Sequence, residues 1–237
     1  MKNTTAQQGK SIIRLENVRR NFRAGKKEIP ALRGVDMDVK KGDFIVIFGP
    51  SGSGKSTLLN ILTGIDKPTE GDVFLDTHHF SEMTAEKRAF VRSRNFGIIY
   101  QMAWWVRSLN VLENIALPLY IAGKNKNDAD ERAREALAKF GVAELAEQFP
   151  TQLSGGEQQL AELARAFVNN PAIIVADEPT GNLDSEASDI VMGYFDKINR
   201  ETNKTIILVT HNSAYWELGN KRAEMKDGKI IKVTSIK

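Results

Sequence analysis

The segment Asp43–Leu62, "DFIVIFGPSGSGKSTLLNIL", constrains the fold of this chain more than any other. Its first six residues are mostly apolar and β-branched or aromatic, as in a strand buried on both faces. Glycines and serines then interrupt the apolar run. Apolar residues return at helical spacing from Leu58 to Leu62, and Gly64 is a stop signal for a helix. The order of strand, glycine-rich loop and helix predicts an α/β fold.

The loop itself, "GPSGSGKST", fits the phosphate-binding pattern G-x-x-x-x-G-K-[ST]. Its glycines let backbone N–H groups curl around phosphate oxygens, Lys55 can reach the β- and γ-phosphates, and the Ser56 hydroxyl can coordinate Mg²⁺. A glycine-rich turn without a ligand is the alternative, but the flanking strand and helix are the context that the motif requires. The predicted nucleotide-binding residues are Gly49, Ser51, Gly52, Ser53, Gly54, Lys55, Ser56 and Thr57.

Two further apolar runs end in polar residues. "AIIVADE" delivers Asp177, which can hold Mg²⁺, and Glu178, which can orient and deprotonate a water against a γ-phosphate. "TIILVTH" ends at His211, which alone could equally be a strand-end histidine satisfied by its neighbours. Ligands of parallel α/β folds sit at the carboxyl ends of the strands, so these side chains are predicted to lie near the nucleotide.

The rest of the chain divides by its periodicity. Alternation predicts antiparallel strands at Ile12–Asn21 and Ala31–Lys40, and further strands at Gly71–Asp76 and Asn95–Gln101. The amphipathic run Asn127–Val142, with Leu112–Leu119, predicts a helical insert at about residues 102–165. The polar start, residues 1–11, reads as a flexible tail.

Composition excludes several classes of protein. The chain has 237 residues, 41% hydrophobic and 27% charged, as in a soluble globular protein. Its 33 Lys and Arg against 30 Asp and Glu give a net charge of +3, too small to indicate a nucleic-acid partner. It has no cysteine, hence no disulfide framework. No apolar run approaches the ~18–20 residues of a membrane span, so a membrane role would require a partner.

A second anion-ready helix start occurs at "LSGGEQQLAELARAF", Leu153–Phe167. Ser154, Gly155 and Gly156 open a helical pattern, where free N–H groups and the positive dipole end favour a phosphate. Alone, this segment is better interpreted as a helix start capped by a serine. Its meaning depends on the other motifs.

Together, these motifs resemble the ATPase subunit of an ABC transporter. The ordered set is the glycine-rich loop, Gln101, "LSGGE", "ADEP", "GNLD" and His211, and the resemblance covers roughly residues 12–232. "LENIALPL" and "ADEPTGNLD" are most similar to the subgroup of lipoprotein-release and macrolide-export ATPases, with the cell-division ATPase nearby. The resemblance implies a P-loop NTPase core with a mixed or parallel sheet, an N-terminal antiparallel β subdomain and an inserted α-helical subdomain, all in one ATPase domain at 12–237.

The resemblance also implies a dimer of two copies packed head to tail. The "LSGG" helix of one copy would close over ATP and Mg²⁺ held by the other, so each chain carries two half-sites. Gln101 would touch Mg²⁺ and the attacking water, and His211 would reach the γ-phosphate. Phe22 would stack on adenine, although core packing is its alternative. The residues assigned to the dimer interface and signature are Ser154, Gly155, Gly156, Glu157 and Asp184; Mg²⁺ would be held by Ser56, Gln101 and Asp177.

The chain departs from the family pattern in two places. Leu160 stands where the family usually has Arg, and Glu162 stands near a position where the family has an apolar residue. Both differences are expected to affect the packing of the signature helix. Trp104 and Trp105 follow Gln101, where the family meets its integral membrane permease, so at least one is predicted to contact it. The alternative is that both tryptophans pack inside the helical subdomain. His78 and His79 match no motif and are predicted on the surface.

The predicted function is an ATPase subunit that powers a bacterial ABC transport complex, for export or lipoprotein extraction, from the cytoplasmic face of the membrane. A force-transmitting complex, as in cell division, stays open. A soluble ABC protein of repair or translation would need a long coiled coil or two ATPase units, and the chain has neither. A small-molecule P-loop kinase would have no use for "LSGGE" or His211.

Overall fold

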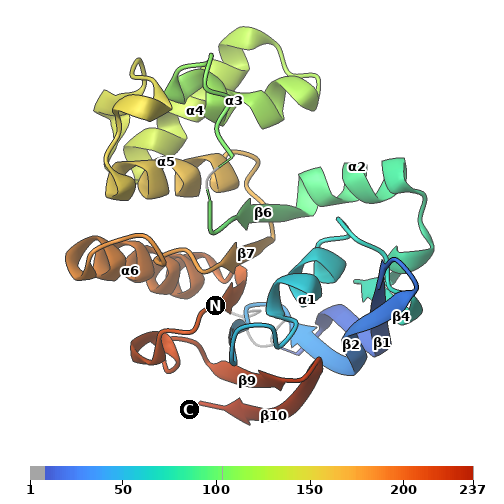
Figure 1. Ribbon diagram of the computed structural model, residues 1–237. Coiled ribbons are helices and arrows are strands. Elements are labelled where there is room, and N and C mark those ends of the chain that lie inside the picture. Colours follow the sequence, from blue (N-terminus) through green and yellow to red (C-terminus); the bar gives the residue numbers. More distant parts are fainter. Residues whose placement is uncertain (1–8, 103, 237) are drawn as a thin grey trace, which may run out of the picture. The chain divides into compact units, whose positions relative to one another are not determined.

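The computed structural model describes residues 9–102 and 104–236 (Figure 1), so most of the predicted tail lies outside the described residues. The chain divides into two compact units. One comprises the residues up to Arg92 together with Ile198 onward, and the other is Ser93–Lys197. Each unit carries part of the predicted nucleotide machinery.

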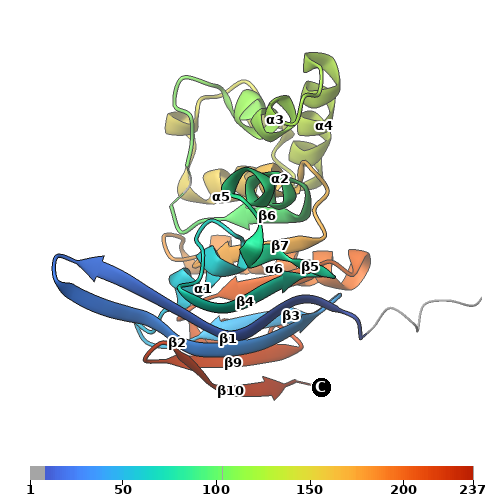
Figure 2. The same cartoon turned by 90° about the vertical axis from the view of Figure 1, so that its right-hand side faces the viewer.

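The first unit begins with an antiparallel sheet of strand order β2-β1-β4-β5 (Figure 2). Its strands are β1 (Ser11–Ala24), β2 (Lys27–Lys40), β4 (Glu70–Leu75) and β5 (His78–His79). The predicted antiparallel pair is therefore confirmed. Both strands run further than predicted because a two-residue turn, with Gly25 at φ 62°, joins Ala24 directly to Lys27.

A second set of strands in this unit follows the order β10-β9-β3-β8. They are β3 (Phe44–Phe48), β8 (Thr205–Val209), β9 (Lys221–Lys226) and β10 (Lys229–Ser235). Strand β3 pairs in parallel with β8 and β9, whereas β9 and β10 are antiparallel, so this sheet is mixed as predicted. The helical segments of this unit are α1 (Lys55–Leu62), η1 (Phe80–Glu82) and η4 (Ser213–Tyr215), with most of α2 (Ala85–Asn95).

The second unit contains the parallel strands β6 (Phe96–Ile99) and β7 (Ile173–Asp177). Between them in sequence lie α3 (Val111–Ile121), α4 (Lys126–Lys139), η2 (Ala143–Leu145), η3 (Pro150–Gln152) and α5 (Gly155–Phe167), which form the predicted helical insertion (Figure 1). Helix α6 (Ser185–Thr202) follows β7. Helix α4 ends before the predicted Val142 because Gly141, at φ 71°, turns the backbone out of the helix.

The helical part is held together by an apolar core. Ile115, Leu137 and Leu163 come from three different helices, and all are fully buried. The ring of Phe140 lies 5.4 Å from that of Phe167 and 5.1 Å from that of Tyr194, so it joins α5 and α6. Among the described residues, no helix combines the length and apolar character needed to cross a membrane.

One buried polar residue, Asn114 on α3, organises the loop that precedes this helix. Its amide nitrogen donates to the carbonyls of Val106, Leu109 and Asn110 at 2.9–3.1 Å, and its Oδ1 accepts from the Val106 amide at 2.9 Å. The Val106 and Asn110 carbonyls also accept main-chain hydrogen bonds, from the amides of Leu109 and Asn114. The Asn114 side chain therefore adds to these bonds and in addition pairs the Val106 amide and the Leu109 carbonyl.

We expect Asn114→Ala to lower the free energy of unfolding by roughly 3 kcal/mol, because it removes four part-buried hydrogen bonds at once and leaves the Val106 amide and the Leu109 carbonyl without this partner. Thermal or denaturant unfolding of the purified chain measures this loss. The control is Asn127→Ala at an exposed position of α4, where a change within about 0.5 kcal/mol is expected. Equal stability of the two variants would contradict the role of Asn114.

Candidate nucleotide-binding site

The glycine-rich loop joins β3 to α1 and leaves the start of α1 open. Gly54 occupies the N-cap position with φ 102°, and no side chain caps the helix. The N–H groups of its first turn therefore remain available to an anion, at the positive end of the helix dipole. The Lys55 Nζ lies over the loop, where it donates to the carbonyls of Gly49 (2.9 Å) and Pro50 (3.1 Å).

Close backbone contacts explain two of the loop glycines. A Cβ on Gly49 would lie 2.1 Å from the Met225 carbonyl oxygen, and one on Gly54 would lie 2.7 Å from that of Ala31. Both contacts are with main-chain atoms, so a larger residue would require the backbone to move. The loop is thus packed against the main chain of β9 and β2, and this packing fixes its curved shape.

The register of two parallel strands brings His211 to the edge where this loop begins. Ile47 of β3 pairs with Val209 of β8, so Gly49 and His211 each lie two residues beyond a matched pair. His211 is exposed there. The first unit therefore brings the loop and the predicted histidine to the same sheet edge.

An equivalent register in the second unit brings together Gln101, Asp177 and Glu178. Ile99 of β6 pairs with Ala176 of β7, and the next residues of both strands leave the sheet at the same edge. A Cβ built on Gly181 would lie 3.7 Å from Gln101 Nε2 and 3.8 Å from Glu178 Cβ. The predicted water-orienting and metal-binding side chains are therefore neighbours in this unit.

Glu178 has a backbone conformation that is unusual for its residue type. Its φ is 48°, in the left-handed region, where a residue with a Cβ costs about 1–2 kcal/mol. A turn follows at once, with the Gly181 amide donating to the Glu178 carbonyl at 3.1 Å. Strain of this kind concentrates at functional sites, which supports the assignment made from the sequence.

The signature helix α5 starts with a reciprocal cap. The Ser154 hydroxyl and amide both donate to Glu157 Oε2, at 2.7 and 2.8 Å, and the Glu157 amide donates back to Ser154 Oγ at 3.4 Å. Hydrogen bonds from the Ser154 hydroxyl lower the pKa of Glu157 most, so its carboxylate is ionised at neutral pH. Here the capping interpretation is correct, and the exposed Ser154 and Gly155 still present this end to solvent.

The signature start lies beside the "GNLD" segment within the same unit. A Cβ on Gly155 would lie 3.5 Å from Leu183 and 3.7 Å from the Asn182 carbonyl. Asp184 is exposed and caps α6 by accepting from the Ala187 amide at 2.8 Å. The side chain of Asn182 donates to the Gln101 carbonyl at 3.4 Å. The sequence did not predict this contact, because Asn182 stands out there only as a member of the "GNLD" motif.

Three predicted aromatic positions can be compared with their surroundings. Phe22 on β1 is 40% exposed and has the Arg20 guanidinium 4.7 Å from its ring centre, so a partly open face remains. Trp104 is 74% exposed. Trp105 is half-buried, with the Arg165 guanidinium 4.6 Å from its ring centre.

His78 and His79 are exposed, as predicted. His79 Nε2 lies 2.7 Å from Asp72 Oδ1, and Glu82 is close to both. Lys67 approaches Glu82 at 4.0 Å. This cluster is a set of side-chain contacts at the surface, outside the nucleotide motifs.

Comparisons with known proteins agree with this geometry. The family model described as "ABC transporter" matches residues 32–181. The lipoprotein-releasing system ATP-binding protein LolD of Aquifex aeolicus is 42% identical over 220 residues, which cover 93% of this chain and 96% of LolD. The macrolide export ATP-binding/permease protein MacB of Syntrophobacter fumaroxidans is 40% identical over 221 residues; these cover 92% of this chain but only 31% of MacB.

A solved structure agrees over almost the full length. It is the dimeric post-hydrolysis state of the ATP-binding cassette MJ0796 bound to ADP and Pi, with a TM-score of 0.89, 36% identity, and coverage of 95% of this chain and 99% of that chain. The fold described above is therefore that of an ATP-binding cassette.

Proposed function

The chain belongs to the ABC transporter family as an ATP-binding cassette of the ATPase class, and we propose that it is the ATP-hydrolysing subunit of a bacterial export or lipoprotein-extraction complex. Its similarity to LolD along nearly the whole length of both chains carries this proposal. The name of MacB is that of a macrolide export ATP-binding/permease protein, and this chain spans 31% of its length.

The glycine-rich loop holds the phosphates of ATP. Uncapped N–H groups at the start of α1 and the loop amides surround the phosphate oxygens, and Lys55 turns from the loop carbonyls to the β- and γ-phosphates. Phe22 offers its open face to adenine. The loop residues Ser51, Gly52, Ser53 and Thr57 contribute to the same cradle.

The oxygen donors of Ser56, Gln101 and Asp177 suit Mg²⁺, which prefers hydroxyl, amide and carboxylate oxygens. A bound Mg²⁺ supplies charge neutralisation for the phosphates. Glu178 accepts a proton from the attacking water, Gln101 orients that water, and His211 hydrogen-bonds the γ-phosphate.

Hydrolysis requires two copies of the chain. Ser154, Gly155 and Gly156 of one copy approach the γ-phosphate bound by the other, with Glu157 and Asp184 at the interface. The dimeric state of the MJ0796 cassette supports this arrangement. ATP then joins the two copies, and its hydrolysis releases them.

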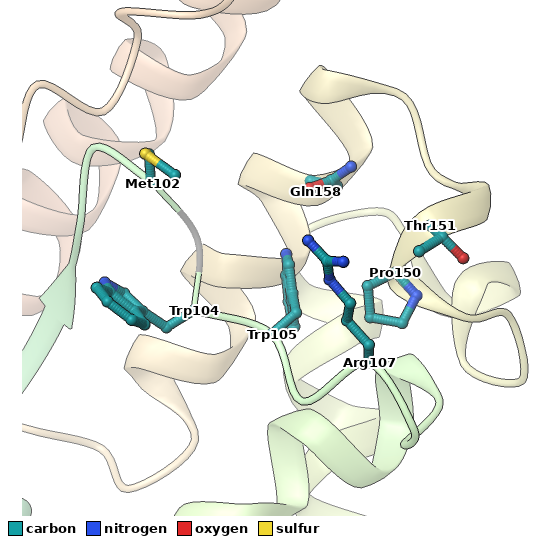
Figure 3. A pocket seen from close by; sticks show the side chains of 7 residues that line it. All are labelled: Met102, Trp104, Trp105, Arg107, Pro150, Thr151 and Gln158. Atoms are coloured by element: carbon teal, nitrogen blue, oxygen red, sulfur yellow. The ribbon is translucent and has the colours of Figure 1, made fainter.

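The permease contact that we propose is a pocket of about 490 Å³ lined by Trp104 and Trp105 (Figure 3). Figure 3 shows Trp105 and Arg107 side by side, with Trp104 and Met102 to their left, Pro150 and Thr151 to their right, and Gln158 above them. A large exposed tryptophan beside a pocket is a common anchor at protein interfaces. Through this contact the subunit works at the cytoplasmic face of the membrane. Identifying the membrane protein that co-purifies with the chain would distinguish an export complex from a force-transmitting complex.

Glu178→Gln is expected to keep ATP binding and to reduce hydrolysis by ~10²–10⁴-fold, because it removes the general base. The ATP-bound dimer should then persist. Phosphate release, nucleotide binding and size-exclusion chromatography with ATP measure these effects. Glu201→Gln, at an exposed position near the end of α6, should retain full turnover; near-normal turnover of the Glu178 variant would exclude its assignment.

Shared sites can be tested with differently tagged copies of the chain. Lys55→Ala in one copy and Ser154→Arg in the other damage the same composite site, so the second site stays intact. Both changes in one copy damage both sites. We expect higher ATPase activity from the first arrangement, measured on affinity-purified mixed dimers. Equal activities would mean that each copy works alone.

Trp104→Ala should leave the melting temperature and ATP affinity of the isolated chain unchanged and weaken assembly with the permease by ~2 kcal/mol or more. Trp105→Ala should lower the melting temperature, because Trp105 packs under Arg165. Ile121→Ala is the matched control, since Ile121 is 76% exposed. If Trp104→Ala assembles as well as this control, the contact is not at Trp104.

A further inference from the structure

Helix α5 carries a buried charged pair that the proposed reaction does not use. Glu162 is completely buried, and the Arg165 side chain is only 15% exposed. Their neighbours on the helix, Leu163 and Ala164, are fully buried apolar residues. Charges in such a setting are costly unless they have close partners.

The two side chains bind each other and the segment that carries Gln101. Arg165 Nη2 lies 3.2 Å from Glu162 Oε1. The same Oε1 accepts from the amide of Tyr100 at 3.4 Å, and Arg165 Nη1 donates to the Trp104 carbonyl at 2.6 Å. The pair therefore holds the backbone on both sides of Gln101.

The cost of this arrangement supports a specific role. Burial raises the pKa of Glu162 to about 7, although Arg165 acts in the opposite direction. Its second oxygen, Oε2, is buried and has no hydrogen-bond partner within the described part of the chain. An apolar residue would avoid both costs, so stability alone does not explain the pair.

Helix α5 also links these anchors to the signature end. Gly155 and Glu162 are seven residues apart, about 10 Å along a helix. Asn182, next to Gly155, donates to the Gln101 carbonyl. The segment around Gln101 is thus bonded to α5 at Tyr100 and Trp104, and the Gln101 carbonyl is bonded to Asn182 beside the start of that helix.

We propose that Glu162 and Arg165 are positioning residues that fix the Gln101 segment to helix α5 in the orientation that hydrolysis requires. The inference rests on the proposed role of Gln101. It explains why a carboxylate at Glu162 accompanies the arginine three residues later on the same helix face. The pair acts through Gln101.

The test is a double-mutant cycle in the full chain, with Glu162→Gln, Gln101→Ala and the combination. Glu162→Gln keeps the side-chain volume and removes the charge. We expect roughly tenfold lower kcat, because misplacement of a catalytic group is costly, with ATP affinity changed by less than about twofold. The combined variant should be no slower than Gln101→Ala alone, since both changes disable the same step.

Arg165→Lys provides a second variant, which keeps the charge and loses the paired N–H geometry; it should show the same kcat loss and the same non-additivity. Glu135→Gln, an exposed carboxylate on α4, is the control and should retain wild-type kcat. Each of the two variants, Glu162→Gln and Arg165→Lys, is combined with Gln101→Ala, and the cycle is read for every variant that folds. If the losses in kcat add in such a cycle, or if both variants keep wild-type kcat, the inference is wrong. Full activity of Gln101→Ala would instead refute the role of Gln101 in the proposed function.

Discussion

The register of two parallel strand pairs is the constraint on which the site depends. Ile47 beside Val209, and Ile99 beside Ala176, determine which residues leave each sheet edge together. A shift of one residue in either pair would turn the following side chains to the opposite face. Because every residue in β7 before Asp177, and every residue of β8, is buried, apolar packing maintains the register, and the core thereby fixes the polar side chains at its edge.

The sequence predicted those parts of the fold and site that follow from local pattern. The strand–loop–helix order, the antiparallel pair and the inserted helices are all encoded in periodicity and glycine placement. Contacts between segments far apart in sequence could not be predicted in this way. In the sequence, the Glu162 carboxylate only departs from the family pattern. The three-dimensional structure reveals the amide of Tyr100, 62 residues away, as one of its partners. The left-handed backbone of Glu178 likewise has no signature in the residue type.

The signature helix combines two roles that share the same atoms. The capping hydrogen bonds of Ser154 stabilise the start of α5, and caps of this type contribute about 1 kcal/mol. The same hydroxyl is the group proposed to meet a phosphate. The Ser154 hydroxyl donates to Glu157 Oε2, with 2.7 Å between the two oxygens. An approaching phosphate therefore competes with a carboxylate that already occupies the positive end of the helix dipole.

Lys55 illustrates a similar competition inside one loop. Its ammonium group donates to two carbonyls of the loop that it serves, those of Gly49 and Pro50. Binding of a triphosphate is therefore an exchange reaction, in which one set of partners replaces another, and the net affinity is the difference between the two sets. A nucleotide whose phosphate chain is too short to reach the ammonium group leaves the original partners in place. In the proposed site, Lys55 would thus distinguish nucleotides by the length of their phosphate chain.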